Sequence, residues 1–147
     1  MSTTIGGTIR AARPTDAAEI ARLAAELGYP VTAAEMTRRL ATVLASPSHH
    51  VAVVASGNRL LGWVGMERRM SLETGERAEL LGLIVDATVR RGGWGHALVK
   101  HAEEWTAAQG LSVLVVRSNV ARDQSHPFYD AIGYPRDKTQ HVYVKRL

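Results

Sequence analysis

Arginine and glycine fill a short segment, residues 90–95, that could bind a phosphorylated ligand. The segment joins the end of an apolar run to the start of an amphipathic one. Glycine allows backbone N–H groups to approach an anion because no Cβ is in the way. The first turn of a helix adds unpaired N–H donors and about half a positive charge from the helix dipole. A phosphate or pyrophosphate placed there gains several charge-assisted hydrogen bonds, so the segment predicts a site for such a group.

Two common phosphate-binding loops do not match this spacing. A P-loop ends in Gly-Lys-Ser/Thr, whereas here Gly95 is followed by His96 and Ala97, which excludes it. A dinucleotide-binding fingerprint needs a small residue where Leu98 stands and an acid after the following strand. Residues 114–116 contain no acid, so that fingerprint is also a poor match.

The sequence predicts strands and helices on both sides of residues 90–95. Apolar periodicity and turn residues predict strands at residues 8–12, 51–55, 60–66, 77–85, 111–116 and 139–144, and helices at 14–28, 32–46, 94–110 and 125–131. The strand, helix and strand that surround residues 90–95 should form a right-handed parallel crossover.

Two sequence motifs resemble those of the GNAT superfamily of N-acetyltransferases. The pattern Arg90-x-x-Gly93-x-Gly95 is similar to the acyl-CoA loop of that family, Gln/Arg-x-x-Gly-x-Gly/Ala. Farther along the chain, residues 125–134 resemble the family motif Ala-x-x-Phe-Tyr-x-x-x-Gly-Phe/Tyr. Ser125 replaces the usual alanine, and Pro127 falls in the first turn of the helix, where proline is tolerated.

The resemblance implies a fold class and a domain organisation. The expected fold is a mixed α/β GNAT fold in which about four helices flank a central, mostly antiparallel sheet of about six to seven strands. One parallel strand pair should be splayed at the cofactor site. Residues 1–147 are expected to form a single domain, which their number allows.

The resemblance also implies an activity, the transfer of an acetyl group from acetyl-CoA to a primary amine of a small molecule. Residues 138–147, together with residues 119–122, resemble a small bacterial branch that includes aminoalkylphosphonate and aminoglycoside N-acetyltransferases, which supports a small-molecule amine as the acceptor. Acetylation of a protein or peptide amine is one alternative. A noncatalytic module that binds acyl-CoA is the other.

Particular residues carry the roles that such a transfer needs. Tyr129 matches the motif tyrosine and is expected to protonate the departing thiolate, while Glu79 is expected to act as the general base. The alternatives are a packed tyrosine and a solvated glutamate, although a β-bulge could redirect Glu79. The expected cofactor-binding residues are Leu83, Ile84, Val85, Arg90, Arg91, Gly92, Gly93, Trp94, Gly95, His96, Asn119 and Phe128. The first three should pair with the pantetheine arm as if it were a strand.

The composition limits the classes of partner. The net charge of +4 suits an anionic co-substrate, but no basic stripe with stacking aromatics indicates nucleic acid. The chain has no cysteine and its histidines have no zinc-site spacing, so no metal is expected. No apolar run approaches the roughly 20 residues of a membrane span, and residues 1–7 lack a signal-peptide core, which predicts a cytoplasmic protein without a membrane partner. A homodimer paired through the C-terminal strands is compatible with the sequence.

Overall fold

The computed structural model describes residues 6–90, 92–118 and 125–147. The chain divides into two compact units, Met1–Arg117 and Ser118–Leu147, and each unit is described by itself. Within the described residues, no helix has the length and apolar character that a membrane span requires.

The described residues of the first unit form five strands and three α-helices. The strands are β1 (Thr8–Ala11), β2 (His49–Ser56), β3 (Arg59–Ser71), β4 (Gly75–Val85) and β5 (Leu114–Val116); the α-helices are α1 (Ala17–Glu26), α2 (Ala33–Ala45) and α3 (Trp94–Ala108). Two short 3₁₀ helices, η1 (Pro14–Asp16) and η2 (Ala87–Val89), precede α1 and follow β4. The order of elements confirms the strand, helix pair, meander and crossover that the sequence predicts.

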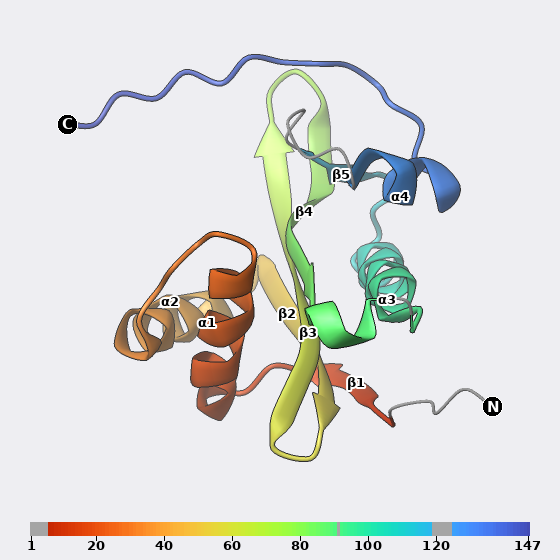
Figure 1. Ribbon diagram of the computed structural model, residues 1–147. Helices are drawn as coiled ribbons and strands as arrows, with labels where there is room; N and C mark the ends of the chain where they lie inside the picture. The colour runs from red at the N-terminus through yellow and green to blue at the C-terminus, as the bar shows by residue number, and fades with distance from the viewer. Residues whose placement is uncertain (1–5, 91, 119–124) are drawn as a thin grey trace. The chain divides into compact units, whose positions relative to one another are not determined.

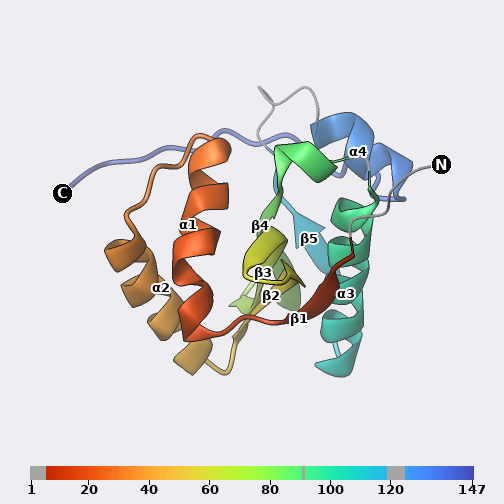
Figure 2. The same cartoon turned by 60° about the horizontal axis from the view of Figure 1, so that its bottom comes forward.

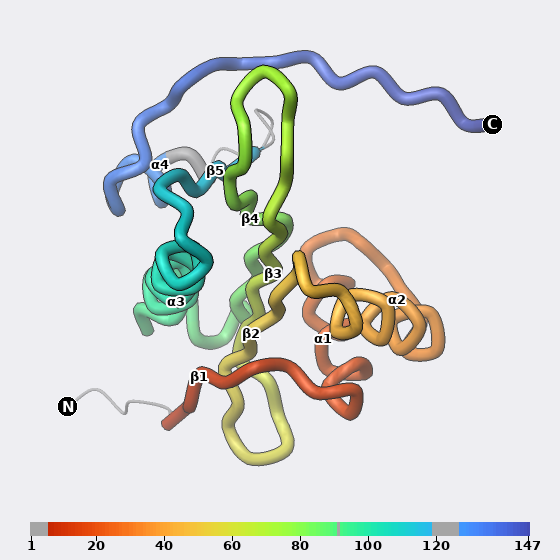
Figure 3. Tube along the Cα trace, turned by 180° about the vertical axis from the view of Figure 1, so that it is seen from behind, coloured from red at the N-terminus to blue at the C-terminus, as the bar shows by residue number. Residues whose placement is uncertain are grey.

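All five strands form one sheet in the order β1-β2-β3-β4-β5. Neighbouring strands are antiparallel from β1 to β4, and β4 pairs with β5 in parallel, as expected for the crossover through α3. Helices α1 and α2 cover one face of the sheet, and α3 covers the other (Figures 1 and 2). The long β3–β4 hairpin is traced in Figure 3.

Local signals explain where the helices begin and end. The Thr32 hydroxyl caps α2 by accepting a hydrogen bond from the backbone N–H of Glu35 at 3.1 Å. Helix α1 is followed by Gly28, whose φ of 96° lies in the left-handed region that ends helices. The apolar face of α1, which includes Leu23 with no exposed surface, packs on Val53 and Ile84 of the sheet and forms the core of this layer.

The second unit contains helix α4 (Ser125–Ala131), as the sequence predicts. The strand expected at residues 139–144 is wrong, because no strand is present among the described residues after 133. Val142 is 84% exposed and Tyr143 is 91% exposed. Alternating residues supply strand propensity, but a strand needs a partner, and none of the five strands pairs with this segment. The sheet therefore has five strands in the described residues instead of six to seven.

Candidate functional site

Strand β4 separates from β5 partway along its length. The parallel pairing covers only Ala78, Glu79 and Leu80, opposite Leu114–Val116. Beyond Leu80, β4 pairs among the described residues only with β3, where Leu83 lies opposite Val64. One edge of residues 83–85 is therefore available to a ligand that forms main-chain hydrogen bonds like an added strand.

A β-bulge in β4 determines which residues share a face of the sheet. Gly82 lies opposite Gly65, but Leu80 lies opposite Met66, so Leu81 is one extra residue in β4. Residues opposite each other in an antiparallel pair point to the same face. Glu79 is opposite Glu67, which follows Gly65 by two positions, so the bulge brings Glu79 to the face covered by α1 and α2.

The Glu79 carboxylate lies between two arginines. Arg69 Nη1 donates to Glu79 Oε2 at 2.5 Å, and Arg117 Nε donates to Oε1. Burial alone would raise the pKa of Glu79, but the hydrogen bonds from both arginines outweigh it and hold the pKa below its ordinary value. Glu79 is only 6% exposed, so the solvated alternative does not describe it. The carboxylate is ionised at neutral pH, and its low pKa weakens it as a proton acceptor.

The glycine-rich segment enters helix α3 through a left-handed residue. Gly93 is the N-cap residue with φ 81°, a conformation in which a side chain would be strained. The amide of Gly92 already donates to the Val89 carbonyl at 3.0 Å, so the donors left for an anion come from the first turn of α3. Arg90 is exposed, and its Nε lies 3.4 Å from the Val85 carbonyl. Its guanidinium therefore stands at the end of β4.

The other expected cofactor-binding residues have varied surroundings. The Trp94 ring packs near Gly7, where an added Cβ would lie 3.0 Å from the indole, so this ring has a packing role beside β1. His96 is exposed on α3. Arg91 and Asn119 lie outside the described residues.

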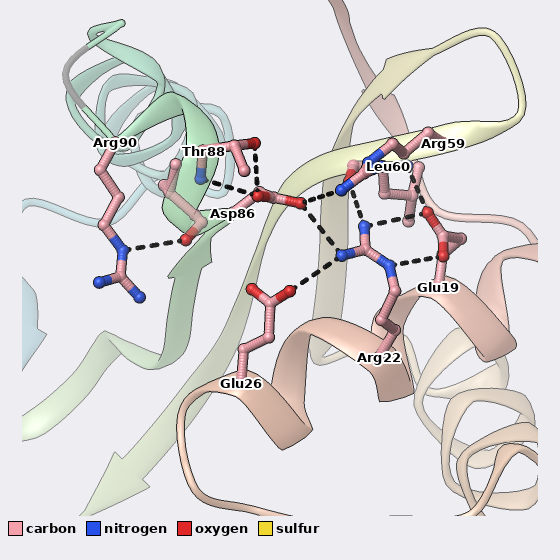
Figure 4. Close-up of polar contacts among 9 residues, drawn as sticks. Glu19, Arg22, Glu26, Arg59, Leu60, Asp86, Thr88 and Arg90 are labelled. Carbon is pink, nitrogen blue, oxygen red and sulfur yellow. Dashed lines mark hydrogen bonds and ion pairs between the residues drawn. The ribbon is translucent and has the colours of Figure 1, made fainter.

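A buried carboxylate between β4 and the glycine-rich segment was not anticipated from the sequence. Asp86 is 1% exposed and accepts hydrogen bonds from the backbone N–H and hydroxyl of Thr88, at 2.9 and 2.7 Å. On its other side it accepts from Arg22 Nη1 and Arg59 Nη2, each at 3.0 Å (Figure 4). Arg22 also donates to Glu19, which accepts from the backbone N–H of residue 60.

This cluster joins three elements at the start of the glycine-rich segment. Burial alone would raise the pKa of Asp86, but the hydrogen bonds from Thr88, Arg59 and Arg22 outweigh it and keep the pKa well below its ordinary value. The ionised carboxylate holds η2 against α1 and the β2–β3 hairpin. The sequence signal that could have revealed it is aspartate two residues before threonine, a common hydrogen-bonded turn.

In the second unit, an aromatic group surrounds the motif tyrosine. The Tyr129 ring makes edge contacts with Phe128 and Tyr134, with ring centroids 5.1 and 6.1 Å apart. The backbone N–H of Tyr134 donates to the Tyr129 carbonyl at 2.9 Å. Burial raises the pKa of the Tyr129 phenol, so it stays protonated at neutral pH and can donate a proton.

Comparisons with known proteins agree on one family. Residues 16–134 match the model of the acetyltransferase (GNAT) family. An uncharacterized N-acetyltransferase, YhdJ of Bacillus subtilis (strain 168), is 26% identical over 98 residues, which are 66% of this chain and 69% of that protein. Aminoglycoside N(6')-acetyltransferase type 1 of Serratia marcescens is 29% identical over 111 residues, 71% of this chain and 75% of that protein.

A solved structure shows the same fold at low identity. AAC(6')-Iy in complex with the bisubstrate analog CoA-S-monomethyl-acetylneamine superposes with a TM-score of 0.85 at 16% identity, covering 97% of this chain and 99% of that one.

Proposed function

This chain belongs to the acetyltransferase (GNAT) family, and from that premise we propose that it transfers an acetyl group from acetyl-CoA to a primary amine of a small molecule. Its N-acetyltransferase relatives identify it as an enzyme, which removes the noncatalytic alternative. One observation carries the proposal. The β4 edge is released from β5 after Leu80, and residues 83–85 of this edge lead through η2 to the Gly93-capped start of α3.

These two features fit the two ends of acetyl-CoA. Main-chain groups of residues 83–85 would hold the pantetheine arm by strand-like hydrogen bonds. The first turn of α3 and the side chains of Arg90 and Arg91 would hold the pyrophosphate. Asn119 and Phe128 complete the proposed cofactor-binding set, on the strength of the family resemblance.

The proposed reaction assigns one proton transfer to each of two residues. When bound, acetyl-CoA supplies a thioester whose carbonyl carbon forms a bond to the neutral amine nitrogen as its carbon–sulfur bond breaks. Tyr129 donates a proton to the departing sulfur, a role that its raised pKa supports. Glu79 accepts the proton that the amine loses, directly or through water.

Because two arginines lower the pKa of Glu79, this carboxylate has a second possible role, binding of the substrate ammonium, which experiment can distinguish from general-base catalysis. A carboxylate with a lowered pKa can hold the substrate ammonium without taking its proton. Replacing Glu79 by glutamine then raises KM for the amine and leaves the pH profile unchanged. Loss of a base instead moves the pH profile upward, because the amine must already be neutral to react.

The acetyl transfer itself is tested by release of free coenzyme A from acetyl-CoA. The purified protein is offered arylalkylamines, polyamines, aminoglycosides and peptides, and each product is identified by the mass of an added acetyl group. Turnover with small amines supports the proposal. Turnover with peptides alone would instead support the alternative, acetylation of a protein or peptide amine. Absence of turnover with every amine overturns it.

The exposed C-terminal segment could pair with the same segment of a second copy of this chain. We propose that Val142 and Val144, which are 84% and 69% exposed, pair with a second copy of the chain in a homodimer. Light scattering on the full chain and on a Val142→Asp variant tests this, since the charged variant should be monomeric. A cytoplasmic location remains part of the proposal.

A further inference from the structure

A small apolar cavity lies between the helix pair and the sheet, within the first unit. Its volume is about 170 Å³. Its lining comes from α1, α2 and strands β2 to β4, and the residues that matter below are Arg39, Val43, His49, Trp63, Gly65 and Leu81. An engineered cavity of about 150 Å³ in another protein binds benzene, so this one has room for a group of that size.

Two glycines that face each other across β3 and β4 make room for the Trp63 ring beside the cavity. Gly65 and Gly82 are paired, and the Trp63 ring lies over both. A Cβ on Gly82 would lie 2.9 Å from the ring, whereas a Cβ on Gly65 would lie 3.7 Å away, at ordinary contact distance. The Trp63 Nε1–H is buried and has no hydrogen-bond partner in the described part of the chain. The indole thus forms a flat apolar part of the cavity lining.

The charges around the cavity do not suit a polycation. Its described lining residues include Arg39 but no acid. The His49 ring is already engaged, with Nε2 2.9 Å from Glu67 and Nδ1 2.9 Å from the Ser46 hydroxyl. A ligand with several ammonium groups would lose hydration here without gaining carboxylate partners.

The cavity lies next to the proposed reaction site. Leu81, the bulged residue of β4, lines the cavity and is 53% exposed, so solvent reaches this end. Glu79 precedes it by two residues and, because of the bulge, lies on the same face as Gly65 and Gly82. Residues 83–85, the proposed path of the pantetheine arm, follow it along the same strand.

We infer that this cavity binds a benzene-sized apolar group of the acceptor amine, whose nitrogen extends past Leu81 toward Glu79. The inference rests on the proposed acetyl transfer and specifies its substrate class, an arylalkylamine or branched alkylamine with a single ammonium group. It distinguishes this chain from relatives named for aminoglycosides, which carry several amines.

The test compares three acceptors, 2-phenylethylamine, 2-aminoethanol and neamine, on the wild-type protein and two cavity variants. Gly65→Ala adds a methyl group at the cavity without a clash, and Val43→Leu adds a methylene from α2. Gly6→Ala is the matched control, since its added methyl meets nothing within 4 Å. Binding of 2-phenylethylamine is also measured by calorimetry, which does not depend on turnover.

We expect the wild type to prefer 2-phenylethylamine and Gly65→Ala to lower kcat/KM for it about tenfold or more, the usual effect of one methyl group in an apolar pocket. Values for 2-aminoethanol and the KM for acetyl-CoA should stay unchanged. A preference for neamine, or a 2-phenylethylamine preference that neither cavity variant alters, overturns the inference while acetyl transfer stands. If no amine is acetylated, binding of 2-phenylethylamine weakened by Gly65→Ala still supports the cavity assignment, and no binding overturns it.

Discussion

Replacing Asp86 tests whether the buried cluster at the end of β4 positions the glycine-rich segment. Asp86→Ala removes the acceptor of four hydrogen bonds, two from Thr88 and one each from Arg22 and Arg59. Asp86→Asn keeps the size of the side chain but removes its charge. Asp137→Asn is the matched control, because that carboxylate is exposed.

The expected loss of folding stability depends on which ion-pair partners Arg22 keeps when Asp86 is replaced. Removing one member of a buried ion pair costs about 3–5 kcal/mol. Arg22 keeps Glu19 and Glu26 as partners, and its side chain is 30% exposed, so the loss lies at the low end of that range. We expect about 3 kcal/mol for Asp86→Ala and about 2 kcal/mol for Asp86→Asn. With a slope of about 2 kcal/mol/M, the alanine variant moves the urea midpoint down by about 1.5 M.

The pH dependence of folding stability independently checks that ionised Asp86 stabilises the fold. The pKa of Asp86 is lower in the folded chain than in the unfolded one, where aspartate titrates near pH 4. Its ionisation therefore stabilises the fold fully above about pH 5, and this stabilisation is lost as the pH falls below about 4 toward the folded pKa. The difference in stability between wild type and Asp86→Asn should shrink over that acidic range.

Urea unfolding followed by tryptophan fluorescence measures the midpoint, and the KM for acetyl-CoA measures the position of the glycine-rich segment. Well below the unfolding midpoint, both Asp86 variants should raise that KM, while the control leaves it unchanged. An Asp86→Ala midpoint equal to that of Asp137→Asn would refute the reasoning, because a carboxylate with four buried partners would then contribute nothing. A normal KM with a lowered midpoint would confine the cluster to stability.

Four other substitutions address the site directly. Gly93→Ala should weaken acetyl-CoA binding and cost about 1 kcal/mol of stability, since φ is 81° there; calorimetry and urea unfolding measure the two effects. Tyr129→Phe should lower kcat more than it changes cofactor affinity, and an unaltered rate would remove its acid role. Glu79→Gln should move the pH profile of kcat/KM upward if the carboxylate is the base, and an unmoved profile with a raised amine KM would assign it to ammonium binding. Gly82→Ala should destabilise the fold by about 1–3 kcal/mol in urea, because its methyl would press on the Trp63 ring; a stable variant would show that the ring moves freely.

The fold could be predicted from the sequence because its signals are local. Alternating and helical apolar patterns located each strand and α-helix of the first unit, but not the short 3₁₀ helix η2, and Gly28 marked the end of α1. The prediction of a strand at residues 139–144 was wrong because a strand also needs a non-local partner. Its pattern is compatible with a strand, but pairing depends on a partner that local sequence does not specify.

The site was less accessible to sequence reasoning because its contacts are distant along the chain. Arg69 of β3 and Arg117, which directly follows β5, both contact Glu79, and Asp86 contacts Arg22 of α1 across 64 positions of the chain. Each acid taken alone is compatible with a solvated side chain. Only the fold brings the cations to them, and with the cations come the lowered pKa values.

One inserted residue connects the fold to the proposed chemistry. Side chains alternate between the faces of a strand, so without Leu81 as an extra residue Glu79 would point to the α3 face, away from Gly65 and Gly82. With it, the carboxylate, the glycine pair and the cavity share one face, while the β4 edge beyond the bulge is free of β5. The same irregularity thus places the proposed base beside the proposed acceptor pocket, next to the strand segment assigned to the cofactor arm. A regular β4 would offer the same residues in an arrangement that separates them.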